Sequence, residues 1–480
     1  MQKKLLAVAV LSAFAGVASA QSSNVTLYGT LLGNFEIAEA TGADSSAAAP
    51  AGGNSSVRGG ALSTGAYTTN AASQSSRSRM NPAGSNFGIR GTEDLGNGLS
   101  AWFQLEFSTA LGAPPPNLGT NSGTAPTARN NAVGLRSRTF GTLLLGSWDT
   151  PFNQMNGYLN PNNRTGSAST GMQANLLGAT TLGYGAVSGQ TALNWCSAAA
   201  GATAAGCFNH GTNFDRRERG SVQWWSPNWN GFEVKAGYVA VMDANAVTAS
   251  NTANGRSIKP YSWDLTGTYT NGPLGVGVAY GRQKDLLAYS AGLAGGAAAT
   301  GTGTGSWSLT SGAAAGTNYM SGSQGTGWRL GARYAFPLGG GNTIGIGGLW
   351  ESTKWTMSYT GQAAGVSDLS ELKKTAWRLS GNFTTGNHFI GLEYTRANEL
   401  RGSIANGAGV ANGFNGGGTG ARGWILSYNY AMSKRTSLTA YYTGITNDTN
   451  ANYSGIVFGG IATAAGADPK YYGLYVRHAF

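Results

Sequence analysis

Several segments of this chain alternate apolar and polar residues with a period of two, which is the pattern of β-strands with two different faces. In residues 327–336 the apolar face ends in aromatic residues and the other face carries arginine. The apolar positions are Trp328, Leu330, Ala332, Tyr334 and Phe336, and the opposite ones are Arg329, Gly331 and Arg333. Residues 232–239 and 375–384 repeat the arrangement. Aromatic residues at strand ends are typical of a membrane interface, so the apolar face is predicted to contact lipid.

The strand-like segments number sixteen, with short and long connections alternating between them. They are residues 25–37, 86–91, 101–107, 131–137, 142–148, 219–226, 232–239, 262–270, 275–282, 327–336, 342–351, 375–384, 388–396, 423–431, 437–444 and 470–480. A closed barrel of this size encloses water, which solvates charges on its inner face. The sequence therefore predicts an all-β fold, a transmembrane 16-stranded antiparallel β-barrel with periplasmic short turns. A soluble β-sandwich is the alternative.

The two ends of the chain give information on export and on the closing strand. Lys3 and Lys4 precede an apolar run over residues 5–17 and then a small-residue site that ends at Ala20. This layout predicts a Sec-type signal peptide over residues 1–20, followed by a single barrel domain over residues 21–480. The last strand ends on Phe480, an aromatic residue on the predicted lipid-facing side. An aromatic residue at this position is what a lipid-facing barrel strand requires. No stretch approaches the roughly twenty apolar residues of a membrane-spanning helix.

The charge balance is basic but dispersed. Removing Lys3 and Lys4 reduces the 31 Lys and Arg residues to 29, which leaves about +9 against 20 acidic residues. These charges occur singly along strands and not in runs, which disfavours a nucleic-acid partner. A pore lumen or an anionic lipopolysaccharide surface explains them better.

No catalytic, cofactor or metal site is predicted. Cys196 and Cys207 lie in one loop segment of an exported chain, which favours a disulfide over free thiols, and only His210 is close enough to suggest a metal site. The three histidines have no serine and acid at a readable triad spacing. The glycine-rich run at residues 301–305 lacks the lysine of a phosphate-binding loop. The chain is therefore not expected to be an enzyme.

Five ordered motifs carry a family resemblance. They are residues 25–29 (VTLYG), 91–96 (GTEDLG) with 103–106 (FQLE), 140–142 (FGT) with 145–146 (LG), 433–436 (SKRT) and the closing strand. Together they closely resemble general porins of β-proteobacteria such as those of Neisseria and Burkholderia. The resemblance implies an outer-membrane homotrimer that passes small hydrophilic solutes and ions by passive diffusion. It also implies that Phe480 is the assembly signal read by the barrel-assembly machinery, which inserts the protein into the outer-membrane lipid. A third long loop folded into the lumen as a constriction is implied as well.

The constriction residues depart from the pattern that the resemblance implies. Asn86, Ser147 and Gln223 are neutral where these porins usually carry arginine, and residues 151–177 contain only Arg164 and no carboxylate. A mild anion preference is therefore expected. Candidate constriction residues are Arg77, Arg79, Asn86, Arg90, Arg136, Ser147, Trp148, Asp149, Arg164, Arg217, Arg219, Gln223 and Trp225, with Arg329, Arg333 and Arg378 as charges of the lumen wall. Solvated wall or loop charges are the alternative for each arginine.

Aromatic residues beside the neutral positions suggest a second function. Trp148, Tyr158 and Trp225 lie near Asn86, Ser147 or Gln223 in this scheme. Aromatic faces beside amides bind sugars or planar solutes, whereas girdle or loop packing would need no ligand. A structural or adhesin barrel with a plugged lumen is a further alternative. Against it, the predicted lumen face of residues 275–281 is mostly glycine, which is expected to leave space unfilled.

Overall fold

The computed structural model describes the chain over residues 24–42, 74–81, 84–109, 127–162, 176–178, 214–240, 261–284, 319–360, 369–405, 411–413, 418–449, 451, 453 and 466–480. The predicted signal peptide, Arg164, the side chain of Arg219, and Cys196 and Cys207 lie outside these described residues. Within the described ranges, no helix has the length and apolar character needed to cross a bilayer.

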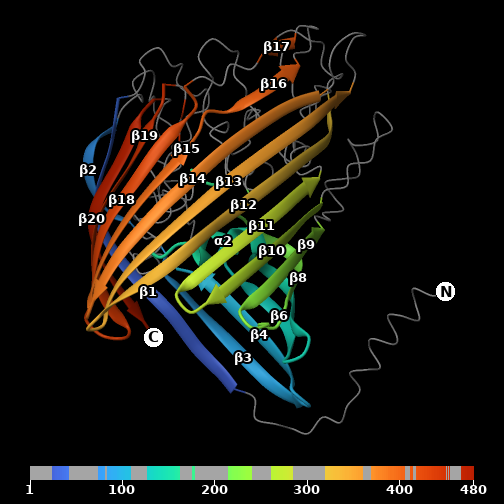
Figure 1. Ribbon diagram of the computed structural model, residues 1–480, viewed down its shortest axis with the longest axis vertical. Helices are drawn as coiled ribbons and strands as arrows, with labels where there is room; N and C mark the ends of the chain where they lie inside the picture. The colour runs from blue at the N-terminus through green and yellow to red at the C-terminus, as the bar shows by residue number, and fades with distance from the viewer. Residues whose placement is uncertain are drawn as a thin grey trace, which may run out of the picture.

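The described residues form one closed antiparallel barrel (Figure 1). Its segments are β1 (Asn24–Thr41), β2 (Gln74–Asn81), β3 (Asn86–Gly96), β4 (Leu99–Ser108), β5 (Thr127–Ala128), β6 (Asn131–Ser137), β7 (Gly141–Asp149), β8 (Arg217–Trp225), β9 (Phe232–Ala240), β10 (Tyr261–Asn271), β11 (Leu274–Lys284), β12 (Tyr319–Gly339), β13 (Asn342–Thr360), β14 (Leu369–Thr385), β15 (His388–Ala397), β16 (Arg401–Ala405), β17 (Ala411–Gly413), β18 (Ala421–Ala431), β19 (Thr436–Asn447) and β20 (Asp468–Ala479).

Twenty segments make sixteen barrel strands, because four neighbouring pairs each continue one strand. The pairs are β2 with β3, β5 with β6, β15 with β16, and β17 with β18; β1, for example, pairs with both β2 and β3. The barrel closes where β1 meets β20, from Thr30 opposite Ala479 to Thr41 opposite Asp468. Beyond that ladder, Gly29 and Phe480 exchange backbone hydrogen bonds of 3.2 and 3.1 Å. The predicted fold class and strand number are therefore confirmed.

The alternation of the sequence becomes the two surfaces of the wall. On β12, Leu330 is 47% exposed on the outer face while Arg329 is fully buried on the inner one. Leu379 on β14 and Leu392 on β15 are exposed on the outer face in the same way. A wall with lipid outside and water inside needs an apolar outer band and polar residues on its inner face. Tyr472, Leu474 and Val476 on β20, and Phe480 directly after it, are all exposed outside, as the sequence predicts.

Strand length is where the structure differs most from the sequence-based ranges. β12, β13 and β14 extend to Tyr319, Thr360 and Leu369, well past the predicted limits at 327, 351 and 375. The added outward positions are largely polar, for example Thr326, Lys354 and Lys373, so they lack the apolar alternation on which the prediction depended. Backbone pairing continues there without an apolar outer face.

The short turns gather at one end of the barrel, and the C-terminus lies at that same end (Figure 1). In the turn between β3 and β4, Gly96, Asn97 and Gly98 have φ values of 84°, 52° and 76°. Only glycine and asparagine adopt such angles at low cost, so this tripeptide fixes the turn.

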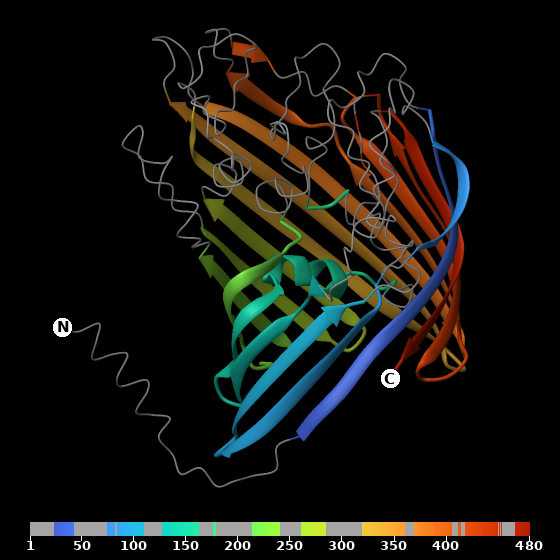
Figure 2. The same cartoon turned by 180° about the vertical axis from the view of Figure 1, so that it is seen from behind.

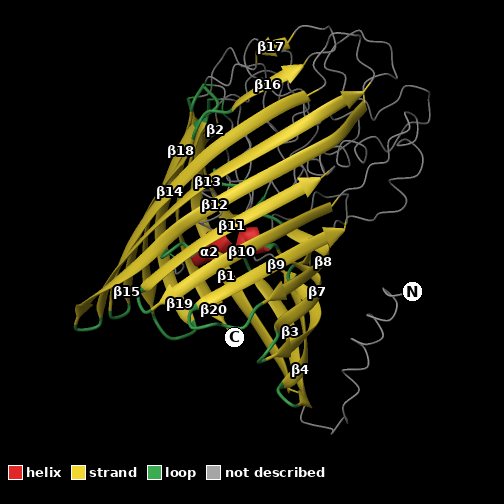
Figure 3. Ribbon diagram, turned by 45° about the vertical axis from the view of Figure 1, so that its right-hand side comes forward, coloured by secondary structure: helices red, strands yellow, loops and turns green. Residues whose placement is uncertain are grey.

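After β7 the chain enters the barrel as the helix α2 (Pro151–Tyr158). Thr150 caps its N-terminus by accepting a hydrogen bond from the Asn153 amide, and Pro151 occupies a first-turn position that needs no amide hydrogen. Phe152 and Met155 are buried. Figures 2 and 3 show α2 inside the ring of strands. Residues 150–162 are called the inner segment below.

Candidate functional site in the barrel lumen

Glycines of the barrel wall make room for the inner segment. A Cβ atom at Gly237 on β9 would lie 2.8 Å from Pro151, and one at Gly347 on β13 would lie 2.7 Å from Pro161. Separations this short do not occur in folded proteins, so these positions require glycine while the segment stays in place. The close approach extends over β9, β11, β12 and β13.

The glycines of β11 correct one expectation from the sequence. Their lumen face was expected to leave space unfilled, but side chains of the inner segment occupy it. A Cβ at Gly277 would meet the Met155 sulfur at 2.6 Å, and one at Gly275 would meet the Tyr158 hydroxyl at 3.2 Å. The glycines face inward as predicted, yet they receive a packed segment and not water.

Arg329 joins the inner segment to the wall. Its guanidinium donates to the Phe152 carbonyl at 3.1 Å and forms an ion pair of 2.7 Å with Asp215. It also pairs with Glu351 on the neighbouring strand β13. Burial raises the pKa of the Asp215 carboxyl, and the Arg329 guanidinium opposes that shift. One fully buried cation therefore connects α2, the residues preceding β8, and the wall.

Three further wall side chains hold the inner segment along its length. Arg378 on β14 donates to the Asn156 carbonyl at 2.9 Å. Glu393 on β15 accepts from Asn160 at 2.8 Å, and Asn382 on β14 donates to the Pro161 carbonyl at 2.9 Å. Arg329 and Arg378 thus face inward, as the alternation predicts, but lie beneath the inner segment. Arg333 is half-buried, with its guanidinium 4.9 Å from the Tyr158 ring.

The wall beneath the inner segment carries almost balanced charge. The buried cations are Arg216, Arg329, Lys374 and Arg378, and the buried carboxylates are Asp215, Glu218, Asp264, Glu351 and Glu393. Four cations against five carboxylates leave no excess positive charge, and the half-buried Lys235, Arg333 and Glu233 on the same wall bring each sign to six. Buried ions are tolerated only when they are paired in this way. This half of the wall therefore contributes little field that could attract an anion.

The opposite wall, formed by β1 to β6, presents arginines to the lumen. Arg90 lies 5.0 Å from the centre of the Tyr28 ring, and Arg136 lies 4.4 Å from that of Trp102. Both arginines are exposed, and neither forms an ion pair with a carboxylate among the described residues. Their positive charge is therefore available to solutes.

Two other candidate arginines, one on this wall and one on β8, have carboxylate partners. Arg79 pairs with Glu36 at 2.6 Å, and Arg217 pairs with Asp149 at 3.0 Å. Arg77 is exposed and stands opposite Ala38 of β1, on the inner face. Two further groups were not recognised in the sequence, namely Arg129 and Glu106, which form an ion pair. Their alternation within β4 and the residues before β6 is the signal that could have revealed them.

The three neutral positions occupy different places. Asn86 lies on the inner face of β3, opposite Thr30. Gln223 is buried, where it donates to the Asp149 carbonyl at 3.1 Å and accepts from the Trp225 indole at 3.1 Å. Ser147 alternates with Leu143 and Leu145, which are exposed on the outer face, at an irregular point in the β7–β8 ladder. The structure thus places Asn86 and Gln223 on the inner side and Ser147 on the outer side.

Three tryptophans meet on the inner face of β4, β7 and β8. The Trp148 ring centre lies 5.7 Å from that of Trp102 and 5.8 Å from that of Trp225, with edge-to-face geometry. Lys235 of β9 lies 4.8 Å from the Trp225 ring and donates to Gln154 of the inner segment at 2.7 Å. Trp102 and Lys235 were not singled out from the sequence. Among the described residues, no three His, Cys, Asp or Glu side chains could hold a metal ion.

An apolar outer face, a closed ring of sixteen strands and a charged lumen together define an outer-membrane β-barrel. A family model described as Gram-negative porin matches residues 7–349, so the chain belongs to this porin family and is located in the outer membrane. It is 28% identical over 296 residues to an outer membrane porin of Bordetella pertussis, covering 58% of this chain and 59% of that protein. The match thus spans less than two thirds of the relative.

Solved structures support the fold. The anion-selective porin from Comamonas acidovorans superimposes with a TM-score of 0.55 at 19% identity, over 96% of this chain and 100% of that one. The trimer form of OmpT from Vibrio cholerae gives a TM-score of 0.51 at 13% identity, again over 96% of this chain and 100% of the other. At these identities the likeness concerns architecture alone.

Proposed function

We propose that this protein is a passive diffusion channel for small hydrophilic solutes and ions with a mild preference for anions. The observation that carries the proposal is the pair of exposed arginines on the β1–β6 wall, Arg90 and Arg136, which have no carboxylate partner among the described residues. Diffusion requires no catalytic group and no cofactor. The anion-selective porin of Comamonas, which shares the fold, supports the choice of ion.

The inner segment and the arginine-bearing wall would form the two sides of the constriction. Cations on one side raise the local concentration of anions, and their effect on ions falls within a Debye length of about 8 Å at physiological salt. Because the wall beneath the inner segment is nearly balanced in charge, no strong transverse field opposes the arginines. A moderate selectivity follows.

Reversal potentials in a salt gradient test this proposal. We expect Arg90→Gln combined with Arg136→Gln to lower the chloride-to-potassium permeability ratio by roughly twofold per charge. A unit charge about 8 Å from the ion contributes about 0.5 kcal/mol in water, or about 0.2 kcal/mol after screening over one Debye length, with opposite signs for the two ions. Lys434→Gln with Arg435→Gln, on the exposed β18–β19 turn, removes the same charge away from the lumen and serves as the control. An unchanged ratio in the Arg90 and Arg136 variant would contradict the proposed anion path. Absence of any conductance would favour a plugged barrel.

The assembly follows from the family and remains part of the proposal. We infer a homotrimer, inserted by the barrel-assembly machinery after removal of residues 1–20, with residues 21–480 as one barrel domain. The trimeric form of OmpT supports the oligomeric state. The outward position of Phe480, packed over Gly29, supports its role as the assembly signal.

The tryptophan cluster favours a second candidate function, preferential passage of planar anions. Cations lie over two of its rings, Arg136 over Trp102 and Lys235 over Trp225, and the half-buried Trp148 and Trp225 leave part of their surface open to a solute. The ring of an aromatic carboxylate would stack on the tryptophans while its carboxylate paired with the cations, whereas a sugar would only stack on the tryptophan rings. We expect benzoate to reduce chloride conductance more than acetate does, and Trp148→Ala to abolish the difference. Equal effects of benzoate and acetate on the unmodified channel would exclude this candidate.

A further inference from the structure

Four cations form a row on the outer face of the barrel, at the end opposite the short turns. Arg282 on β11 and Lys354 on β13 stand opposite the same residue of β12, Thr326. Lys354 in turn stands opposite Lys373 on β14, and Lys373 stands opposite Arg401 on β16. These four residues, Arg282, Lys354, Lys373 and Arg401, are called the outer basic row.

The register shows that the row faces away from the lumen. Thr353 and Lys374, the chain neighbours of Lys354 and Lys373, are buried on the inner face. The side chains of Lys354 and Lys373 are correspondingly 40% and 53% exposed. The row is thus separated from the ion path by the wall itself.

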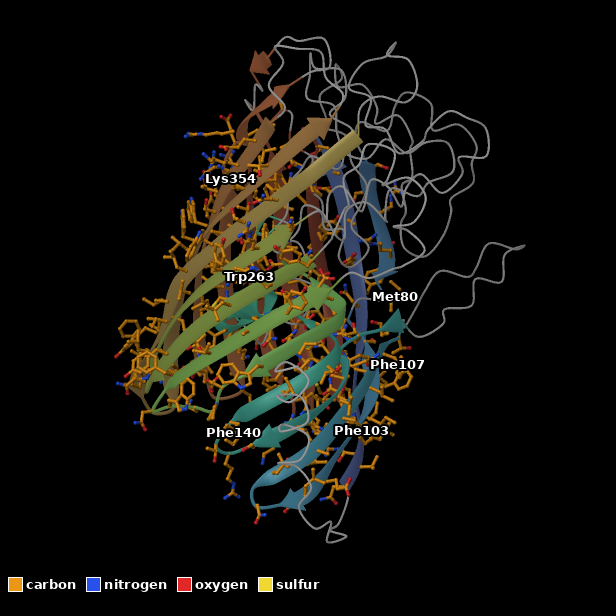
Figure 4. All side chains as sticks on the ribbon, turned by 90° about the vertical axis from the view of Figure 1, so that its right-hand side faces the viewer. Met80, Phe103, Phe107, Phe140, Trp263 and Lys354 are labelled. Carbon is orange, nitrogen blue, oxygen red and sulfur yellow. The ribbon has the colours of Figure 1, made fainter. Side chains whose placement is uncertain are left out.

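Aromatic residues fix the depth of the row in the membrane. Tyr280 and Trp328 stand opposite each other, each two residues closer to the short turns than Arg282 and Thr326, with ring centres 4.5 Å apart. Figure 4 shows Lys354 nearer one end of the barrel than Trp263, with Phe140 towards the other end. Tyrosine and tryptophan mark the level of the headgroups, so the cations just beyond them lie where lipid phosphates lie.

The cations of the outer basic row repel one another when no anion is bound to them. Like charges directly opposite each other on neighbouring strands are destabilising, and Lys354, Lys373 and Arg401 occupy three such successive positions. Glu371 bridges both lysines, at 2.5 and 2.7 Å, and offsets one charge of the four. Arg282 meets only an amide among the described residues, at 3.2 Å from Gln324. A net charge of +3 remains on this patch.

We propose that the outer basic row binds the phosphate groups of lipid headgroups in the outer leaflet. Guanidinium and ammonium groups on neighbouring strands offer several donors to a phosphate, and the exposed outer face places them beside lipid and not beside solutes in transit. The proposal rests on the orientation given under the proposed function, with the short turns periplasmic. It does not depend on conduction.

Native mass spectrometry of the purified folded protein can count bound lipid A, a diphosphorylated saccharide lipid of the outer leaflet. We expect Lys354→Gln with Lys373→Gln to weaken binding by roughly tenfold or more, because each cation near an anionic headgroup contributes about one factor of five. Arg282→Gln with Arg401→Gln should give a similar loss without disturbing Glu371. Lys434→Gln with Arg435→Gln, at the opposite rim, is the matched control and should leave binding unchanged.

Glu371→Gln distinguishes a ligand site from a structural ion-pair cluster. A site for phosphate predicts tighter lipid binding in this variant, because both lysines lose their competing carboxylate, whereas a purely structural cluster predicts only a less stable barrel.

Lipid A without phosphates should bind equally to all variants. Unchanged binding of phosphorylated lipid A in both paired Gln variants would overturn the proposal. Equal binding of inorganic phosphate at the same concentration would overturn the assignment to a lipid. Conductance recordings on the same variants separate these outcomes from a failure of the channel function.

Discussion

The two halves of the lumen wall use the same residue type for opposite purposes. On β12 and β14, Arg329 and Arg378 are buried under the inner segment and bound to its backbone carbonyls. On β3 and β6, Arg90 and Arg136 lie over aromatic rings and remain exposed. All four alternate correctly with outward apolar residues. The difference lies in what covers them, because the inner segment packs over the first pair, whereas only rings of the wall, those of Tyr28 and Trp102, lie beside the second.

The comparison shows why an inward-facing arginine is not by itself a selectivity residue. Where neighbouring inner positions are glycine, as at Gly327 and Gly331 beside Arg329, another part of the chain packs against the wall. The arginine then stabilises that contact. Gly88 and Gly134, the inner glycines beside Arg90 and Arg136, are instead covered by the rings of Tyr28 and Trp102 from the wall itself. No described segment buries these two arginines, and their charge stays available.

The largest expected effect comes from removing the guanidinium of Arg329, which holds the inner segment to the wall. Arg329→Met leaves Asp215 and Glu351 buried without their shared cation, and loss of one partner of a buried ion pair costs about 3–5 kcal/mol. We expect a clear drop in the urea concentration at which the barrel unfolds, together with noisier single-channel currents as the inner segment loosens. Arg90→Met, in the exposed half, should change the unfolding midpoint little. Similar stability of the two variants would contradict the division of the wall.

A smaller effect is expected from filling one of the wall glycines. Gly347→Ala places a methyl group against the rigid ring of Pro161 and the Leu159 carbonyl, at 2.7 and 2.9 Å. Overpacking of this kind typically costs about 1–3 kcal/mol. We expect a modest loss of stability and an altered conductance, since the inner segment must move. Gly33→Ala is the control, because its added Cβ would meet no atom within 4 Å. Equal conductance in both variants would show that the segment does not limit the ion path.

Much of the architecture was predictable, because a lipid-facing wall imposes one simple rule on every strand. The alternation of Trp328, Arg329 and Leu330 indicates which residues face lipid and which face the lumen, and the lengths of the connections give the strand number. The packing of the inner segment could not be read in this way. Its partners Arg378, Asn382 and Glu393 lie more than 220 residues further along the chain, and no local pattern pairs them with residues 150–162. The glycines of β11 were therefore interpreted as empty space.

The smallest expected effect concerns the three neutral positions. They test whether the alternation of residues still tells inner from outer positions beside the register shift between β7 and β8. Asn86 faces the lumen, so Asn86→Arg should raise the chloride-to-potassium permeability ratio by roughly twofold, the effect of one added charge near the ion path. Gln223→Arg should raise the permeability ratio less than Asn86→Arg does, because Gln223 is buried against Trp225 and Asp149.

Ser147 shares the outer face of Leu143 and Leu145, so Ser147→Arg should not raise the ratio. It should instead reduce the yield of folded barrel, since arginine on the lipid face costs up to about 2–4 kcal/mol at the membrane midplane. Reversal potentials and the fraction of heat-modifiable protein measure the two effects separately. If Ser147→Arg raised the ratio as much as Asn86→Arg, the residue at position 147 would have to face the lumen, and the irregularity between Gly146 and Trp148 would turn it inward.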